Sequence, residues 1–290
     1  MSALAIPLMP AEGRQPRVTR ISPYALRPAD GYRSDPEAFG AVDVPGIGRG
    51  VKVSLASQKE DFEQVFRLLA SNYQTRGYEP ASGKPLRFTP FHALPETTVF
   101  VAKQGRKVVG TLSLVPDNAI LGLPMESVYA SEIKSLREDG RNLVEVTSLA
   151  DRELSIRESV PVLVTLIRVM AQFAAGQGAH TWVITVNPRH RPFYERIMGF
   201  IPIGPRKAYP AVQNHPADAL AVTMPLLAIN APAMYRQLFG ETLPPSVLRP
   251  ASMSADLVRS FAADSTQTDL TTVDEILLKV EQRAARQCCR

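Results

Sequence analysis

LVEVTSL, residues Leu143–Leu149, alternates apolar and polar side chains as a half-buried β-strand does. TWVITV, residues Thr181–Val186, is rich in β-branched and aromatic residues and predicts a strand that is buried on both faces. The segment between them, Pro161–Ala175, is apolar around most of a helical circumference and predicts a buried helix. Strand–helix–strand units form parallel pairs with a right-handed crossover. We therefore expect two adjacent parallel strands at the centre of a sheet.

The flanking sequence supplies the other elements of an α/β layer arrangement. Amphipathic spacing predicts helices, and β-rich runs predict strands, two of which are joined by a hairpin turn at Gln104–Gly105. With the central unit, these elements predict a mixed α/β (α+β) sheet flanked by helices. The expected helices are Lys59–Asn72, Glu126–Glu138, Arg191–Met198 and Thr272–Ala285, and the expected strands are Thr98–Ala102, Lys107–Val115, Ile201–Ile203 and Ala219–Met224.

The chain divides into three segments of different character. Residues 1–50 contain seven prolines and many glycines without any sustained periodicity, which predicts an extended or disordered arm. Residues 51–228 hold nearly all of the expected helices and strands and form the predicted catalytic domain. Residues 229–290 form a predicted helical C-terminal extension.

The composition is that of a globular protein, with 45% hydrophobic and 21% charged residues. The formal net charge is +5, and the basic residues are scattered along the chain. A nucleic-acid-binding protein more often carries a dense basic stripe with interleaved aromatic residues, so this class is not expected. The charge suits an acidic protein partner or an anionic substrate, and it is equally typical of a solvated surface.

The ends of the chain give no indication of export or metal binding. The two cysteines, Cys288 and Cys289, are adjacent, so they cannot link distant segments or complete a zinc site. The apolar N-terminal stretch is interrupted by Pro7 and Pro10, and no basic region precedes it. No uninterrupted apolar stretch reaches the ~18 residues that span a bilayer. We therefore expect a cytoplasmic protein without an integral membrane segment or a metal.

The most specific short pattern is VNPRHRPFYERIMGF, residues Val186–Phe200. Asn187 ends a strand, Tyr194 follows seven residues later in a short helix, and Gly199 and Phe200 come after it. This arrangement resembles the N-x6-Y and G-F pattern of the GNAT superfamily of acyltransferases, with one additional residue between the Tyr and the Gly. The resemblance implies the GNAT fold.

In that fold, the two central parallel strands splay apart at one end. The resemblance implies that the splay holds a phosphopantetheine arm by strand-like pairing and that a backbone N–H polarises the thioester carbonyl. It also implies that Asn187 contributes to substrate binding and that Tyr194 protonates the departing thiolate. As aromatic residues at helical spacing, Tyr194 and Phe200 are also consistent with simple core packing.

One departure from the GNAT pattern concerns the donor. GNAT enzymes that use coenzyme A bind its pyrophosphate with a glycine-rich loop at a helix N-terminus. The corresponding segment here, DRELSIRESVP (Asp151–Pro161), contains no glycine, and backbone without glycine rarely approaches a pyrophosphate closely. We therefore expect acyl carrier protein, which presents the same arm on an acidic helix. The expected contacts for that helix are Arg152, Arg157, Arg189, Arg191 and Arg196, each of which is also consistent with an ordinary surface arginine.

A narrower resemblance covers approximately residues 51–226. The stretches VVGTLSLVPDNAILGLPMESVY, LVEVTSLA and NPRHRPFYERIMGFIPIGPRKAYP are similar to those of bacterial N-acyl amino acid synthases, which acylate amino acids from carrier-protein thioesters. That family is related to the acyl-homoserine-lactone synthases, which share a strand Glu, here Glu145, and an aromatic-rich first helix, here with Phe66, Tyr73 and Tyr78. The lactone synthases usually carry an Arg where this chain has Leu69, which counts against lactone synthesis.

Glu145 is the expected catalytic base, because the ammonium group of an amino acid must lose a proton before it attacks a thioester. A structural role, with Glu145 bonded to neighbouring backbone amides, is an equal alternative. Thr147, Ser148 and Leu149 on the same strand are expected to bind the acceptor or the arm. His190 is a rival base and is also typical of a solvated loop residue. No permanently bound cofactor is expected.

Three functions remain open at this point. The first is transfer of a long-chain fatty acyl group from acyl carrier protein to the amine of an amino acid. The second is acetyl transfer from acetyl-coenzyme A to a small amine, which the glycine-free loop disfavours. The third is a catalytically silent module that binds acyl carrier protein.

Overall fold

The computed structural model describes residues 39–47, 50–80, 83–152 and 154–288. Most of the segment 1–50 lies outside the described residues, so the expectation of an extended or disordered arm falls mainly on residues that are not described. Cys289 also lies outside them. The part of that segment that is described contains a short strand, Val42–Asp43, which joins the edge of the sheet.

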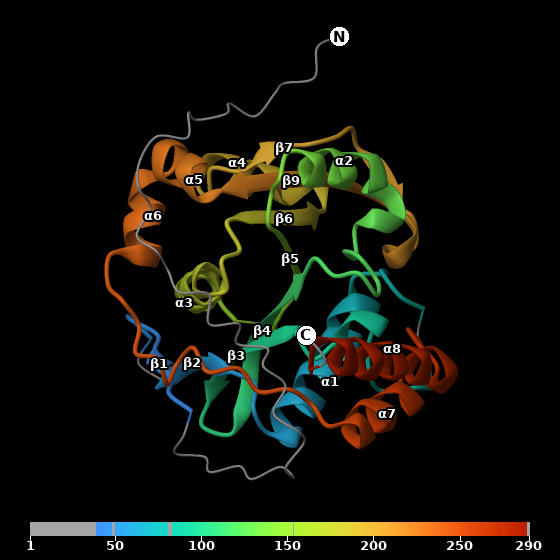
Figure 1. Cartoon of the computed structure of the whole chain (residues 1–290). Helices are drawn as coiled ribbons and strands as arrows, with labels where there is room; N and C mark the ends of the chain where they lie inside the picture. The colour runs from blue at the N-terminus through green and yellow to red at the C-terminus, as the bar shows by residue number, and fades with distance from the viewer. Residues whose placement is uncertain (1–38, 48–49, 81–82, 153, 289–290) are drawn as a thin grey trace.

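The described chain forms a nine-stranded mixed sheet whose order is β1-β2-β3-β4-β5-β6-β9-β7, with β8 paired to β9 (Figure 1). Every pairing is antiparallel except that between β5 and β6, which is the parallel pair expected from the sequence. The strands are β1 (Val42–Asp43), β2 (Val51–Leu55), β3 (Thr98–Gln104), β4 (Lys107–Pro116), β5 (Leu143–Asp151), β6 (Thr181–Val186), β7 (Ile201–Pro202), β8 (Lys207–Tyr209) and β9 (His215–Thr223).

Helices cover both faces of the sheet, as Figure 1 shows. On one side α3 lies with α5 and α6, and on the other side lie α1, α2, α7 and α8. The helices are α1 (Lys59–Thr75), α2 (Glu126–Glu138), α3 (Ile156–Gly176), α4 (Arg191–Arg196), α5 (Met224–Asn230), α6 (Pro232–Phe239), α7 (Ala255–Ala263) and α8 (Leu270–Cys288), with 3-10 turns at Pro90–Ala93, Pro188–His190 and Pro210–Val212.

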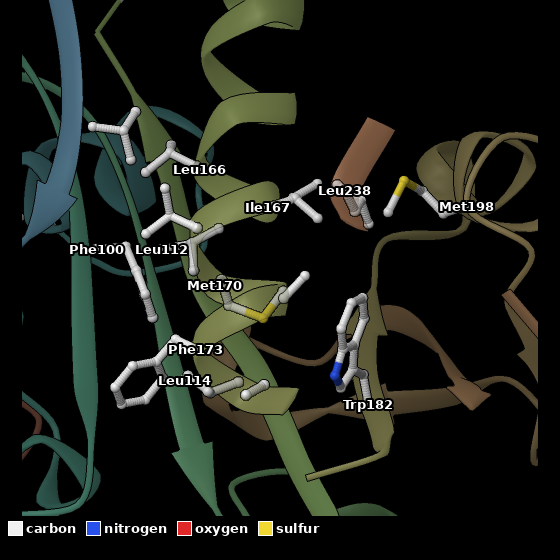
Figure 2. Packing of buried hydrophobic residues seen from close by; sticks show 14 of the residues in the cluster. Phe100, Leu112, Leu114, Leu166, Ile167, Met170, Phe173, Trp182, Met198 and Leu238 are labelled. Atoms are coloured by element: carbon white, nitrogen blue, oxygen red, sulfur yellow. The ribbon is translucent and has the colours of Figure 1, made fainter. Parts of the chain in front are cut away.

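The largest hydrophobic core lies between α3 and the sheet (Figure 2). Phe100 of β3 makes an edge-to-face contact with Phe173 of α3, with a ring-centroid distance of 5.7 Å. Leu166 and Met170 of α3 and Trp182 of β6 are almost completely buried in the same cluster. The apolar circumference of α3 is thus explained by its central position.

α3 is also the one described helix that is long and apolar enough, by length and composition, to cross a membrane. Of its most apolar window, 56% is buried inside the protein, where it packs in the main core. Core helices commonly have this composition, so its apolar character needs no membrane.

Each expected element is present, and the largest differences in bounds are at the starts of β9, which begins at His215 instead of Ala219, and of α3. This helix begins at Ile156, five residues before the predicted Pro161. Ser155 and Glu158 form a capping box that stabilises the additional turn. Periodicity in the apolar residues could not find this turn because its side chains, from Arg157 to Ser159, are polar and lie outside the core.

Candidate active site

The central feature of the site is the divergence of β5 and β6. Their register pairs Leu143 with Thr181, Val144 with Trp182 and Glu145 with Val183, and then ends. Beyond this point β5 stays paired with β4 and β6 stays paired with β9, so both strands continue within the sheet while their facing edges separate. The expected splay is confirmed.

A bulge in β5 accompanies the divergence. The β4–β5 register shifts between Thr111, which pairs with Ala150, and Ser113, which pairs with Thr147. The extra length on β5 is taken up at Ser148, whose φ of 55° lies in the left-handed region. A bulge of this kind bends a strand and increases its twist. Ser148 therefore turns β5 away from β6 where the gap begins.

The gap leads into a cavity of about 620 Å³ between α3, the sheet and α4. Because the facing edges of Val146–Ala150 and Ile184–Val186 take no part in pairing with each other, their backbone groups are available to a ligand that pairs like a strand. The interior wall is apolar and includes Leu112, Val146, Leu166, Met170, Trp182 and Ile184.

The rim of the same cavity is polar. Asp151 and Ser159 lie near the start of α3, and Arg76 lies just past the end of α1. Asn187, Arg189 and His190 lie beyond β6. An apolar interior with a polar rim suits a ligand with a long hydrocarbon chain and a polar carrier end.

Tyr194 lies in α4 and lines the cavity. Its ring makes edge-to-face contacts with Phe193 and Phe200, with centroid distances of 5.3 and 5.7 Å. Burial raises the pKa of the Tyr194 phenol to about 12, so the hydroxyl stays protonated at neutral pH. Tyr194 therefore has both a packing role and a proton available at the cavity.

Asn187 lies where β6 ends and holds two segments together. Its side-chain oxygen accepts the backbone N–H of Arg189 at 3.1 Å, which caps the 3-10 turn. Its amide nitrogen donates to the hydroxyl of Tyr78 at 3.3 Å. Asn187 and Tyr78 both line the cavity, so this bond connects the end of β6 to the loop after α1 at the rim.

Thr147, Ser148 and Leu149 also line the cavity. Ser148 is buried, whereas Leu149 is 40% exposed, although it is apolar. Thr185, on the opposite side of the gap, has a buried hydroxyl oxygen without a hydrogen-bond partner among the described residues. Thr185 could not be identified from the sequence, because a threonine in a buried strand has no feature that separates it from packing residues.

Glu145 lies on the other face of the sheet and is not among the residues that line the cavity. Val144 and Val146 pack in the α3 core, whereas Leu143 packs in the cluster formed with α2, and alternation along the strand places Glu145 on the α2 face. Its side chain is 2% exposed, and its carboxylate accepts the backbone N–H of Met125 at 2.8 Å.

The environment of Glu145 disfavours its charge. Burial, followed by the nearby negative charge of Glu126, raises the pKa of the Glu145 carboxyl to about 8, although the Met125 N–H acts in the opposite direction. A carboxyl with this pKa can exchange a proton with an amine near neutral pH.

A polar and aromatic cluster lies near Glu145. The guanidinium of buried Arg87 lies 3.8 Å above the ring of Tyr73, and Arg87 is also ion-paired with Glu79. Tyr209 of β8 interacts electrostatically with Glu145, Tyr73 and Arg87, and burial is the largest cause of its raised pKa. Arg87 and Tyr209 were missed by sequence reasoning, since neither lies in a periodic segment.

The cluster and the cavity are connected. Tyr73, under the Arg87 guanidinium, also lines the cavity, as does Tyr78, whose ring lies 5.8 Å from that of Tyr73. Tyr78 in turn contacts His215 at the start of β9, with a centroid distance of 5.0 Å. Tyr73 therefore contacts both the cavity and the polar cluster on the opposite face of the sheet.

The five arginines expected to meet a carrier protein differ in their environment. Arg189 lines the cavity rim, and Arg152, Arg157 and Arg196 are exposed. Arg191 is partly buried and pairs with Glu195 at 2.9 Å and with Asp218 at 3.7 Å.

His190 is exposed on the rim, where its Nε2 accepts from the Nε of Arg189 at 2.9 Å. Partial burial of the ring, followed by the positive charges of Arg189 and Arg76, lowers the pKa of His190. Within the part of the chain that the structure describes, no group of His, Cys, Asp and Glu side chains could hold a metal ion.

The start of α3 adjoins the mouth of the cavity. Glu158 lies one position before Ser159, which lines the cavity, and its carboxylate accepts the Ser155 hydroxyl at 2.7 Å and the Ser155 N–H at 3.2 Å. The Ser155 side chain reciprocally accepts the N–H of Glu158. This end of the helix, which electrostatically attracts anions, therefore already holds a carboxylate of the protein.

A mixed sheet with one parallel pair that splays onto a cavity beneath a buried helix defines a GNAT-like acyltransferase fold. The family model "N-acyl amino acid synthase FeeM" matches residues 64–223, more than half of the chain, and the protein belongs to this family. It is accordingly an acyltransferase that makes N-acyl amino acids.

The structure of FeeM, an N-acyl amino acid synthase from uncultured soil microbes, is 29% identical over 63% of this chain and 96% of that chain, with a TM-score of 0.56. The acyl-homoserine-lactone synthase LasI is 14% identical over 67% and 96% of the two chains, with a TM-score of 0.49. The coenzyme A-dependent lactone synthase MesI is 17% identical over 66% and 97%, with a TM-score of 0.47. A search of curated protein sequences found no match.

Proposed function

We propose that the acyl donor of this N-acyl amino acid synthase is a long-chain thioester of acyl carrier protein. The observation that carries the proposal is the N-terminus of α3. A coenzyme A pyrophosphate needs free backbone amides and a positive field there, but the Ser155–Glu158 capping box uses two amides and adds a carboxylate. Acyl carrier protein brings the phosphopantetheine arm without the nucleotide and avoids this conflict.

The rim of the cavity supports the same donor. Arg189 lies on the rim, and the exposed Arg152, Arg157 and Arg196 each lie within two residues along the chain of a cavity-lining residue. We therefore expect these arginines to complement an acidic helix. Their individual contributions are small, but together such charges accelerate association at low ionic strength. The large apolar interior suits a fatty acyl chain better than an acetyl group.

In the proposed reaction, the arm lies between the separated edges of β5 and β6. The amine of the amino acid attacks the thioester carbonyl, the new C–N bond forms, the C–S bond breaks, and the thiol leaves. A backbone N–H in the gap stabilises the oxyanion. Tyr194 donates its proton to the departing sulfur and regains one from the nitrogen, which loses its second proton as the amide forms. The raised pKa of the phenol keeps its proton in place until the sulfur departs.

We further propose that the acceptor enters from the α2 face of the sheet. There the ionised form of Glu145 removes the proton from the ammonium group, directly or through water, and its pKa of about 8 makes this form accessible near neutral pH. Arg87 and Tyr209 supply polar partners for the carboxylate end of an amino acid. Tyr73 and Tyr78 connect this region to the gap.

A donor comparison tests the proposal. Palmitoyl-carrier protein and palmitoyl-coenzyme A are compared as donors to a mixed pool of amino acids, with products identified by mass spectrometry. We expect a higher kcat/KM with palmitoyl-carrier protein than with palmitoyl-coenzyme A. Changing Arg189 and Arg196 to glutamate should lower kcat/KM for the carrier-protein donor and leave the value for the coenzyme A donor unchanged. Efficient acetyl-coenzyme A turnover without carrier-protein turnover contradicts the donor proposal, and binding without any turnover supports a silent module.

A further inference from the structure

Trp182 lies at the deep end of the cavity. It pairs with Val144 in the closed part of the β5–β6 ladder, below the point where the strands separate. Its side chain is 1% exposed to solvent and contributes to the cavity wall. Figure 2 shows the indole beside the lower turns of α3, below Met198.

The indole N–H of Trp182 is a buried donor without a hydrogen-bond partner among the described residues. Indole nitrogen can only donate, so it needs an oxygen or another acceptor nearby. Buried polar groups in folded proteins are nearly always paired, and an exception calls for an explanation. In Figure 2 the nitrogen lies on the edge of the indole nearer to α3.

Among the described residues, no side chain accepts a hydrogen bond from the indole. Leu112, Met170, Ile184 and Met198, which line the same cavity as Trp182, are all apolar. Burying an unpaired N–H costs free energy. In a cavity that binds only hydrocarbon, a phenylalanine would fill similar space without that cost. The missing acceptor is therefore expected on the molecule that fills the cavity.

In the proposed reaction the thioester carbonyl lies between the free edges of β5 and β6, which begin above the level of Trp182. Pairing ends at Val183, and Ile184 is the first residue of β6 with a free inner edge. Trp182 lies two residues below Ile184, which is roughly 6–7 Å along a strand. An oxygen that meets the indole therefore belongs to the acyl chain itself, several carbons beyond the reacting carbonyl.

We infer that this synthase selects acyl chains that carry a hydroxyl or keto oxygen within their buried part, and that Trp182 recognises that oxygen. The inference rests on the proposed function, in that the cavity holds the acyl chain. Thr185 has a second unpaired polar group, a hydroxyl, and it lies on the part of β6 that is no longer paired with β5. Among the described cavity-lining residues with an unpaired polar group, Trp182 is the one in the paired part of β6.

A binding experiment tests the inference without requiring turnover. Trp182 is the one tryptophan of the chain, so its fluorescence reports on this site directly. The full chain is titrated with hexadecanoic acid and with a series of hexadecanoic acids hydroxylated at successive carbons. At one position we expect an affinity about tenfold higher than for the plain acid, the size of effect typical of one hydrogen bond, together with a red shift of the emission.

A kinetic experiment adds the residue-specific control. Plain and hydroxylated hexadecanoyl thioesters are compared in wild type, Trp182→Phe and Met198→Leu. Trp182→Phe removes the N–H and keeps an aromatic ring, so the ratio of kcat/KM values should fall to about one. Met198→Leu changes the same wall without removing a donor and should keep the wild-type ratio.

Equal affinity for every acid in the series, or a preference that survives Trp182→Phe, overturns the inference. These results differ from a failure of the proposed donor. If coenzyme A thioesters rather than carrier-protein thioesters support turnover, the donor proposal fails while the preference for an oxygenated chain is still measured.

Discussion

The backbone N–H of Met125, one residue before α2, donates to the carboxylate of Glu145 at 2.8 Å. This bond links the N-terminus of α2 to the middle of β5, and it is the one described hydrogen bond that favours the charged form of Glu145. Burial outweighs it, so the carboxyl is protonated at neutral pH in the resting protein. Glu145 therefore combines a structural tie with a proton that can be exchanged.

The first prediction concerns stability. Because the folded-state pKa of Glu145, about 8, exceeds its ordinary value of 4.5, the folded state holds one more proton between these pH values. Stability due to this group therefore falls as pH rises from 5 to 8, by about 3 kcal/mol. Glu145→Gln should remove this dependence. Chemical denaturation at each pH should therefore show that the free energy of unfolding of the variant increases relative to that of the wild type as pH rises. A constant difference between the two proteins would contradict the raised pKa.

The second prediction concerns the base. If Glu145 accepts the ammonium proton, kcat/KM rises with pH and levels above about 8, where the carboxylate is ionised. Glu145→Gln keeps the side-chain oxygen that accepts from Met125 and should lower kcat roughly 10²–10⁴-fold. Unchanged turnover in a folded Glu145→Gln variant would leave the residue with its structural role only.

The third prediction concerns Tyr194. Tyr194→Phe keeps the ring contacts with Phe193 and Phe200 and removes the proton donor. We expect kcat to fall roughly 10²-fold or more, while the thermal midpoint stays nearly unchanged. An acyl thioester with an acidic aromatic thiol should restore most of the rate, since that thiolate leaves without protonation. Lack of rescue would indicate that the ring serves packing.

The fourth prediction concerns the bulge. The left-handed conformation of Ser148 is strained for a β-branched residue and easy for glycine. Ser148→Val should lower the free energy of unfolding by about 1–2 kcal/mol, and Ser148→Gly should be nearly neutral. Both values come from denaturant titration. Equal free energies of unfolding for the two variants would show that the left-handed conformation of Ser148 is not required for the bulge in β5.

The fifth prediction concerns donor choice. Glu158→Gln keeps a side-chain acceptor for the capping box and removes the carboxylate charge from the start of α3. We expect kcat/KM for acyl-coenzyme A to rise roughly 2–5-fold, with little change for the carrier-protein thioester, because the charge no longer repels a pyrophosphate. Glu138→Gln, at an exposed position on α2, provides a control away from that helix end and from the expected carrier contacts. Equal changes with both donors would contradict the argument.

Much of this fold follows from local patterns in the chain. The apolar periodicity of α1 and α3, the β-branched run of β6 and the turn at Gln104–Gly105 each encode their element within a short window. The parallel pairing of β5 with β6 also follows, because a strand, a buried helix and a strand have only one common arrangement. Residues near that unit, such as Asn187 and Tyr194, could therefore be expected at the cavity.

Other features depend on contacts between segments that are distant in sequence. The direction of Glu145, away from the cavity, depends on the strand's register, which only its partners β4 and β6 establish. Arg87 meets Tyr73, and Tyr209 meets Glu145, through long-range packing that no local pattern encodes. The unpaired N–H of Trp182 is likewise a property of its surroundings. Short-range sequence determined which elements form, whereas burial and neighbouring charge, which exist only in the folded chain, decided the chemistry of each side chain.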